Sequence, residues 1–226
     1  TFISMFASAV TSLLGALFDW ASLRWLALAF VPVQAFALAM CLHAHLAPLS
    51  PGANDNTSAV GVTLALAHRL AAEPLAHTEV QFVFTGCEEV GAYGMRAYLD
   101  AHAKELGSHT LILVPEQVGT GRLQLVTGEG LVLKRPVRPE ALDLGRLAAA
   151  AIPDLMLTEK LGEAYSDALP AMQRGLTALT ITSDPKAIGE ESHWHQMSDT
   201  LEHIYPDSLK DAYAFILEII LEIDRA

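Results

Sequence analysis

Residues 51–61, PGANDNTSAVG, join a tight turn to the beginning of a helix. Proline, glycine and asparagine favour a turn, and the residues from Ala59 to Ala67 are uncharged and mostly apolar, which is typical of a buried helix. Asn56 or Thr57 is expected to cap this helix and so to fix the direction of the Asp55 carboxylate. Asp55 either contributes only to the cap or bridges two divalent cations, and the rest of the sequence is needed to choose between these roles.

The chain has 226 residues, enough for one α/β domain, and its formal net charge is −12. Residues 1–50 contain only two charged side chains, Asp19 and Arg24, so the acidic excess belongs to residues 51–226. An acidic domain argues against nucleic acid as a partner, because binding phosphates requires basic side chains. The two cysteines are too few for a disulfide framework or a thiolate zinc site, so we expect oxygen and imidazole ligands for any metal.

The first fifty residues are strongly apolar. Phe2–Phe18 and Trp25–Leu42 are uncharged runs, and each is close to the roughly 17–25 residues needed to cross a membrane. We therefore predict a membrane-inserted helical hairpin over residues 1–50 and a membrane location for the protein. Pro32 and Gln34 leave a second possibility open, in which both runs are buried helices of a soluble core. The first run lacks the features of a signal peptide and does not begin with methionine, so we expect a longer parent sequence.

Residues 51–226 alternate between helix and strand patterns. The expected helices cover about residues 57–72, 92–105, 140–151 and 206–223, and the expected strands cover about residues 78–85, 109–115, 122–127 and 176–182. This alternation predicts an α/β domain in which a largely parallel mixed sheet lies between layers of helices, preceded by the hydrophobic hairpin. In such folds, binding sites lie beyond the carboxyl ends of the strands.

Acidic side chains follow two of the expected strands. Glu88 and Glu89 come after the strand at 78–85, and Glu116 comes after the strand at 109–115. Neighbouring side chains point in different directions, so one glutamate of the pair can bind a metal while the other faces a water molecule as a general base. Each of these acids could instead be an ordinary solvated residue in a loop or at the start of a helix.

His195 lies in a polar loop, four residues before Asp199. A histidine in this position can coordinate a metal with one ring nitrogen while the nearby acid holds the other. The alternative is an ordinary surface histidine.

Four motifs carry a resemblance to a known family. They are PGANDNTSAVGV at 51–62, FTGCEEVGAYGMRAYL at 84–99, PEQVG at 115–119 and HQMSDT at 195–200. In type, order and separation they resemble the co-catalytic dizinc aminopeptidases, metallo-exopeptidases that share a fold with glutaminyl cyclases and the transferrin receptor ectodomain. The first two motifs are specific, the third is degenerate and the fourth is moderately specific. The resemblance covers most of residues 51–226 and implies a three-layer αβα fold of the zinc-exopeptidase type.

The resemblance also implies a role for each candidate residue. Asp55 would bridge two zinc ions, with Glu89 and His195 completing the ligands of one ion. Glu116 would help to hold the other ion. Glu88 would be the general base that takes a proton from the bridging water and passes it to the leaving amine. These roles agree with the chemistry of zinc, which lowers the pKa of bound water and polarises a carbonyl group.

Two positions depart from the family pattern. Glu116 stands where the family usually has an aspartate, and its longer side chain can still reach a metal. Trp194 stands where some relatives have a tyrosine that stabilises the oxyanion. Trp194 is therefore the candidate for contacts with the oxyanion or the substrate.

The family's first histidine ligand, in a His-x-Asp motif before the bridging aspartate, has two possible counterparts. His43 lies twelve residues before Asp55, although His45 then stands where the motif has its aspartate. Alternatively, residues 1–50 are a hydrophobic insertion like that of some membrane-associated relatives, and the ligand lies upstream of Thr1. In that case the domain lacks one metal ligand and its first strands, and one of the two zinc ions would bind weakly or not at all.

The sequence therefore favours a membrane-anchored zinc hydrolase that removes N-terminal residues from peptide substrates. One alternative is an inactive relative that serves as a scaffold or interaction domain. The other is a glutaminyl cyclase-like acyltransferase with a single zinc ion. The sequence does not indicate the preferred substrate side chain or the oligomeric state.

Overall fold

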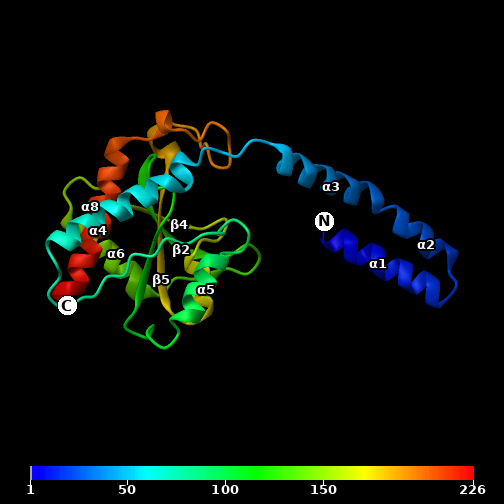
Figure 1. Ribbon diagram of the computed structural model, residues 1–226, viewed down its shortest axis with the longest axis horizontal. Helices are drawn as coiled ribbons and strands as arrows, with labels where there is room; N and C mark the ends of the chain where they lie inside the picture. The colour runs from blue at the N-terminus through cyan, green and yellow to red at the C-terminus, as the bar shows by residue number, and fades with distance from the viewer. Residues whose placement is uncertain (1) are drawn as a thin grey trace. The chain divides into compact units, whose positions relative to one another are not determined.

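The computed structural model describes residues 2–226, and the chain divides into two compact units, residues 1–49 and residues 50–226 (Figure 1). Each unit is described separately. The first consists of helices, and the second contains the sheet and all the acidic motifs.

The first unit contains three helices, α1 (Phe2–Leu17), α2 (Ala21–Leu28) and α3 (Val31–Leu46), and α1 packs against the other two. The second apolar run was expected to form one helix, but it is divided between α2 and α3. Pro32 lies in the first turn of α3 and has no backbone N–H to continue the α2 ladder, so a new helix begins there.

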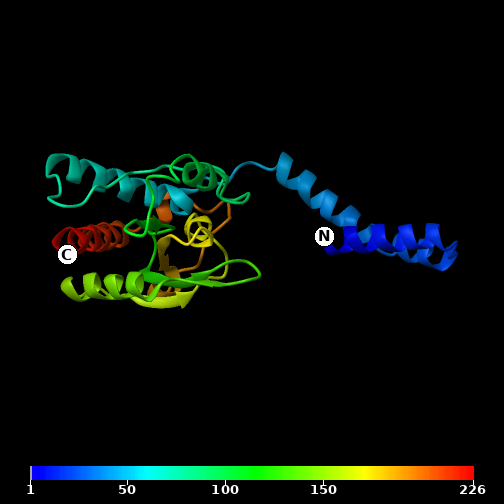
Figure 2. The ribbon, with the colours of Figure 1, turned by 90° about the horizontal axis from the view of Figure 1, so that it is seen from below.

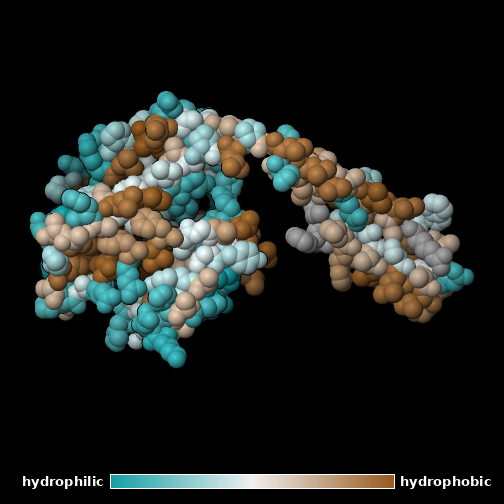
Figure 3. Space-filling view, in the orientation of Figure 1, coloured by the Kyte–Doolittle hydropathy of each residue, from teal (hydrophilic) through white to brown (hydrophobic). Residues whose placement is uncertain are grey.

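Large apolar side chains cover the surface of this unit (Figure 3). Ile3, Trp25 and Leu46 are 86%, 71% and 81% exposed. The helical stretch Ala21–Leu46 is long and apolar enough to span a membrane, a criterion of length and composition that a buried core helix or a signal sequence also meets. Membrane insertion of residues 1–50 therefore stays a prediction.

The second unit is a mixed α/β domain. Its helices are α4 (Ala59–Ala72), α5 (Tyr93–Ala101), α6 (Pro139–Ala151), α7 (Ala168–Gln173) and α8 (Pro206–Arg225). Its strands are β1 (Leu111–Pro115), β2 (Arg122–Glu129), β3 (Arg135–Pro136), β4 (Thr158–Leu161) and β5 (Thr177–Asp184). Three short helical turns complete it, η1 (Ala53–Ser58), η2 (Pro185–Ile188) and η3 (Leu201–His203).

The five strands form one mixed sheet in the order β1-β5-β2-β3, with β4 also paired to β2. The β1–β5 and β2–β4 pairs are parallel, whereas β2 is antiparallel to both β5 and β3. The sheet is thus mixed, as expected, but half of its pairings are antiparallel. The direct connection from β1 to β2 is too short for a crossover helix.

Helices cover both faces of the sheet. The first group, α4, α6 and α8, packs together on one side, and α5 and α7 pack together on the other (Figure 2). The central strand β5 is buried on both faces, which is typical of a layered α/β core. The largest fully buried apolar side chains come from both layers and the sheet, and they are Phe215, Leu99, Leu123, Leu125, Leu179, Ile181, Ile219 and Val118.

The expected strand at residues 78–85 is not formed. These residues run as an extended segment without a ladder partner. Their β-branched and aromatic composition favours a strand, but a strand also requires an adjacent edge within hydrogen-bonding distance.

Candidate metal centre

Asp199 holds the turn that carries Asp55. Its fully buried carboxylate accepts hydrogen bonds from the backbone N–H groups of Asn54 at 2.7 Å and Asp55 at 3.0 Å. The Asp199 carbonyl oxygen accepts a third bond, from the N–H of Ala53 at 3.1 Å. The sequence predicts that Asp199 orients the ring of His195, but its two carboxylate oxygens accept hydrogen bonds from the turn instead. The acid therefore fixes the position of Asp55.

The same turn is tied to the loop after β1. The N–H of Gly119 donates to Asn54 Oδ1 at 2.8 Å, and the N–H of Gln117 donates to Asn56 Oδ1 at 3.1 Å. A Cβ atom at residue 119 would lie 2.9 Å from atoms of Asn54 and Ser58, so glycine permits this close approach. The sequence predicts Asn56 or Thr57 as the cap of α4, but the N-cap residue is Ser58, and the Asn56 amide is engaged with Pro115 instead.

Glu88 and Glu89 lie on a tightly bonded loop. The Glu88 carbonyl oxygen accepts hydrogen bonds from the N–H groups of Gly91 and Ala92 at 2.9 and 2.8 Å. The N–H of Gly94 donates to the Gly86 carbonyl at 3.0 Å. Glu88 is half-buried whereas Glu89 is exposed, so the two adjacent carboxylates occupy different environments, as different roles require.

Three of the predicted ligands converge on one point. His195 Nε2 lies 2.9 Å from Glu89 Oε1 and 3.5 Å from Asp55 Oδ2. One ligand atom from each of the three residues lies within 4.8 Å of the other two. Among the described residues, this is the group of acidic and imidazole side chains that could hold a metal ion.

The donor set fits zinc. Two carboxylate oxygens and one imidazole nitrogen are ligands that zinc accepts, and three protein ligands are the usual number at a catalytic zinc site. Zinc–ligand bonds of about 2.0–2.2 Å place the ligand atoms of a tetrahedral site roughly 3.3–3.6 Å from one another. The 2.9 and 3.5 Å spacings from His195 Nε2 are close to that requirement. Asp55, Glu89 and His195 would hold the ion.

The surrounding acids raise one another's pKa. Burial, followed by the charges of Glu89 and Asp167, raises the pKa of Glu88 to about 7. Burial and the charges of Glu88 and Asp55 raise the pKa of Glu116 well above its usual range. The pKa of Asp55 is also raised, by burial and Glu89, while His195 acts in the opposite direction. A bound cation would offset this concentration of negative charge.

These side chains line a cavity of about 730 Å³. Asp55, Glu88, Glu89 and Glu116 contribute carboxylates to it, and the loop around His195 forms another part of its wall. A cavity of this size is within the usual range for binding a small molecule or the end of a peptide.

The other predicted residues are placed differently. Glu116 lines the same cavity but is not part of the three-residue group. Trp194 lies against His195, with ring centroids 4.4 Å apart, and a hydrogen bond from its side chain lowers the pKa of Asp55. His43 is exposed on α3, in the other unit, and does not belong to the described ligand group.

Three residues near the site were missed by sequence reasoning. The Tyr165 hydroxyl donates to the carbonyl oxygens of Glu88 and Glu89, both at 3.5 Å. Asp167 accepts a hydrogen bond from the Thr85 hydroxyl. Glu129 is 3% exposed and lies at the end of β2. Residues 158–167 have no apolar periodicity, so no local pattern indicates that Tyr165 and Asp167 lie beside the site.

The sequence matches Peptidase family M28 over residues 32–220. Aminopeptidase YwaD of Bacillus subtilis is 29% identical over 184 residues, which cover 77% of this chain and 38% of that protein. The chain thus spans well under half of the length of this relative.

Solved structures give the same picture of the fold. BSAP, a zinc aminopeptidase from Bacillus subtilis, superposes with a TM-score of 0.63 and 26% identity, over 78% of this chain and 43% of BSAP. A glutaminyl cyclase from an Acidobacteriales bacterium superposes with a TM-score of 0.58 over 77% of this chain and 62% of that one, and at 22% identity it supports the fold alone.

Proposed function

Because the chain belongs to peptidase family M28, we propose that it hydrolyses peptide bonds with the help of zinc and removes residues from the N-terminus of peptides. The observation that carries this proposal is the convergence of Asp55, Glu89 and His195, with Glu88 next to them at the wall of the same cavity. The chain spans 38% of the length of Aminopeptidase YwaD, and the activity is proposed on this basis for the region that the two share.

Zinc, when bound, supplies Lewis-acid chemistry, by which it makes water more acidic and polarises a carbonyl group. The ligands contribute orientation. Asp199 and the loop after β1 fix the Asp55 turn on two sides, so the carboxylate is held in place before a substrate arrives. Such preorganisation lowers the cost of reaching the transition state.

Glu88 is the proposed general base. Its pKa of about 7 allows it to accept a proton from water near neutral pH and to return that proton to the leaving amine. The Tyr165 hydroxyl bonds to the backbone on either side of the Glu88–Glu89 peptide link and so helps to position both carboxylates. Trp194 is proposed to contact the substrate or the oxyanion.

A second zinc ion is part of the proposal. Asp55 would be shared between the two ions, and Glu116 would bind the second through a side chain that lines the same cavity. Its further ligand would be His43, His45 or a residue upstream of Thr1. We propose that this second ion binds more weakly than the first, because fewer ligands converge on it.

The test is zinc analysis and aminopeptidase assay of the full chain, purified in detergent. We expect bound zinc and hydrolysis of aminoacyl p-nitroanilides at neutral pH. His195→Gln should lose both, whereas His68→Gln, which changes an exposed histidine on α4, should lose neither. A protein that holds no zinc and cleaves none of these substrates would support the scaffold alternative. Cyclisation of an N-terminal glutamine without hydrolysis would support the glutaminyl cyclase alternative.

A further inference from the structure

The cavity that contains the proposed metal centre also contains a buried acid with no assigned role. Glu129, at the end of β2, is 3% exposed and lines this cavity of about 730 Å³ together with Ser166 and Thr180. It does not belong to the three-residue group that would hold zinc. The proposed hydrolysis therefore leaves this carboxylate unused.

Hydrogen bonds within the protein compensate the Glu129 carboxylate only weakly. The Ser166 hydroxyl donates to Glu129 Oε1 at 3.2 Å, and the Thr180 hydroxyl donates to Glu129 Oε2 at 3.4 Å. The two hydroxyl oxygens also lie 2.8 Å from each other, and a hydroxyl that donates to its neighbour has no proton left for the carboxylate. Long hydrogen bonds from uncharged donors are less than a buried charge requires.

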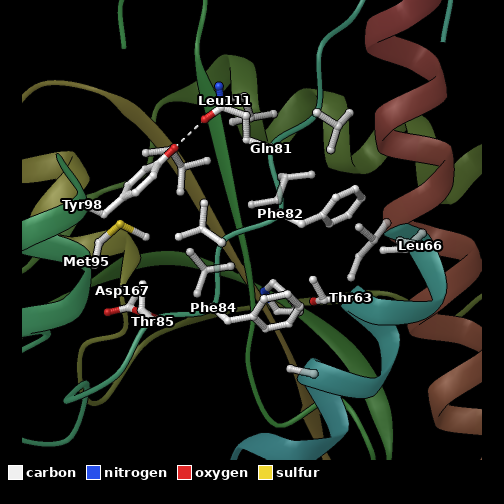
Figure 4. A pocket seen from close by; sticks show the side chains of 18 of the residues that line it. Thr63, Leu66, Gln81, Phe82, Phe84, Thr85, Met95, Tyr98, Leu111 and Asp167 are labelled. Carbon is white, nitrogen blue, oxygen red and sulfur yellow. Dashed lines mark hydrogen bonds between the residues drawn. The ribbon is translucent and has the colours of Figure 1, made fainter. Parts of the chain in front are cut away.

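No basic side chain of residues 2–226 balances this charge. Burial raises the pKa of Glu129 to about 7, and the side chains that act on it are two hydroxyls and the carboxylate of Asp167. Asp167 lines a different cavity, where it lies against Thr85 (Figure 4). Lys160 lines the same cavity as Glu129 but is exposed and forms no ion pair with it. A cation from outside the protein would supply the missing partner.

Apolar side chains line the cavity beside this acid. Val126 precedes Glu129 on β2, Leu131 follows it in the next loop, and both line the same cavity. Lysine and arginine have long apolar stems that pack along such surfaces while the charged end reaches a polar partner. A buried acid with apolar neighbours therefore fits a basic side chain better than a small cation.

The chemistry of aminopeptidases distinguishes this cation from the α-amino group of the substrate. In the first residue of a peptide, the α-amino group and the scissile carbonyl are bonded to the same carbon atom, so both lie at the metal centre. The ammonium group of a lysine side chain is separated from that carbon by a flexible four-carbon stem. Glu129 shares the cavity but lies outside the group of zinc ligands, so its position suits the side chain rather than the α-amino group.

We propose that Glu129 binds the basic side chain of the substrate's first residue, so that peptides beginning with lysine or arginine are preferred. This inference rests on the proposed aminopeptidase function. The ion pair would offset the burial of the Glu129 carboxylate. An apolar side chain of the same length would leave the carboxylate without a charged partner, and an acidic side chain would be repelled by it.

Equilibrium binding tests the inference without relying on hydrolysis. The probes are the amino alcohols lysinol and norleucinol, which have no bond to cleave and differ in the terminal amino group of the side chain. Calorimetric titration of the full chain in detergent with zinc should give a Kd for lysinol about ten to a hundred times lower than for norleucinol. Glu129→Gln should bind the two about equally. Glu140→Gln, which removes an exposed charge on α6, should keep the preference.

Hydrolysis gives a second measurement. In the wild type, kcat/KM for lysyl p-nitroanilide should exceed that for norleucyl p-nitroanilide about ten- to a hundredfold, and the ratio should fall to about one in Glu129→Gln. A merely structural role of Glu129, which joins β2 to Thr180 on β5, would change both values together and leave their ratio as it is in the wild type.

The outcomes separate this inference from the proposed function. Equal binding of the two amino alcohols by the wild type, or a preference for lysinol that survives in Glu129→Gln, would overturn the inference. Equally fast hydrolysis of both nitroanilides would also overturn it, while the aminopeptidase function would stand. Preferential binding of lysinol that depends on Glu129, without hydrolysis of either nitroanilide, would support the pocket for a basic side chain and contradict the proposed function.

Discussion

Glu88 and Glu89 are adjacent and identical in chemistry, yet their environments differ. Glu89 Oε1 contacts the imidazole of His195, whereas Glu88 is half-buried and carries a pKa of about 7. We expect Glu88→Gln to retain zinc while kcat falls by about 10²–10⁴-fold, because a general base acts mainly in the transition state. Glu89→Gln is the matched control and should lose zinc. Zinc content and kcat of both variants decide the assignment, and loss of zinc from Glu88→Gln would reverse the two roles.

Asp199 offers a prediction about the turn rather than about the chemistry. In the wild type, the Asp199 carboxylate accepts hydrogen bonds from two backbone N–H groups. In Asp199→Asn, the amide NH₂ group would face one of these N–H groups, and two donors cannot form a hydrogen bond. An unpaired buried donor costs about 1–3 kcal/mol, so we expect a loss of stability of that size and weaker zinc binding. Urea unfolding and zinc titration measure the two effects. Asp154→Asn, an exposed change, should show neither, and equal zinc affinity in Asp199→Asn would contradict the proposed control of Asp55.

Glu129 makes stability depend on pH. Burial raises its pKa to about 7, although hydrogen bonds from Ser166 and Thr180 act against the rise. The folded state therefore holds this proton more tightly than the unfolded state, so the stabilisation present below about pH 4.5 is lost as the pH rises through about 7. Glutamine does not ionise, so Glu129→Gln avoids this loss. Relative to the wild type, its free energy of unfolding should increase by about 1–3 kcal/mol between pH 5 and pH 8. Denaturant unfolding at both pH values checks this, and a pH-independent difference would contradict it.

The four helices expected in the α/β unit are formed, and each buries apolar residues against the core. Helix α5 ends at Ala101 rather than near residue 105, and the short helix α7 was not predicted. In α8, Phe215 and Ile219 are fully buried in the core, on a stripe that the spacing of apolar residues already predicted over 206–223. Phe215→Ala should destabilise the domain by about 3–5 kcal/mol through the cavity it leaves. Leu147→Ala, at an exposed position on α6, should change stability by no more than about 0.5 kcal/mol. Chemical unfolding midpoints give both values, and similar effects of the two changes would contradict this account of the core.

The positions of the main strands could be predicted from the sequence, but their pairing could not. Strands β1, β2 and β5 were predicted within two residues at each end, because apolar β-branched runs bounded by turns are a local signal. Residues 78–85 have an equally strong signal but no partner edge, and a single sequence does not reveal a partner. The antiparallel pairing of β2 and the short strands β3 and β4 were also not predicted, because strand pairing depends on contacts between residues that are distant in the sequence.

In the candidate site, too, local sequence predicts some residues, whereas others depend on contacts between distant parts of the chain. Asp55, Glu89 and His195 could be singled out because each stands in a recognisable motif after a turn or strand. The role of Asp199 could not be predicted, since its hydrogen bonds join residues far apart in the sequence. Residue types and motifs therefore predicted three side chains that lie together, but not the residues that hold them in place.

At the scale of the whole molecule, the two units differ in the polarity of their surfaces. The helices at residues 1–49 expose large apolar side chains, whereas residues 50–226 carry the acidic charge. We expect the full chain to float with liposomes of neutral phosphatidylcholine in a density gradient at high salt, because insertion of apolar helices does not depend on charge. Residues 50–226 expressed separately should remain at the bottom. Flotation of neither protein would contradict membrane insertion, and flotation of both would assign it to the wrong unit.

The three side chains of the proposed metal centre come from both ends of the α/β unit, with Asp55 before the sheet and His195 after its last strand. Leu131, Val132 and Leu133 form an exposed loop between these ends. A protease that nicks this loop would leave Asp55 and Glu89 on one fragment and His195 on the other. Neither fragment alone would carry all three proposed ligands. Strands β1 and β2 on the first fragment both pair with β5 on the second, and so provide a way for the halves to reassociate.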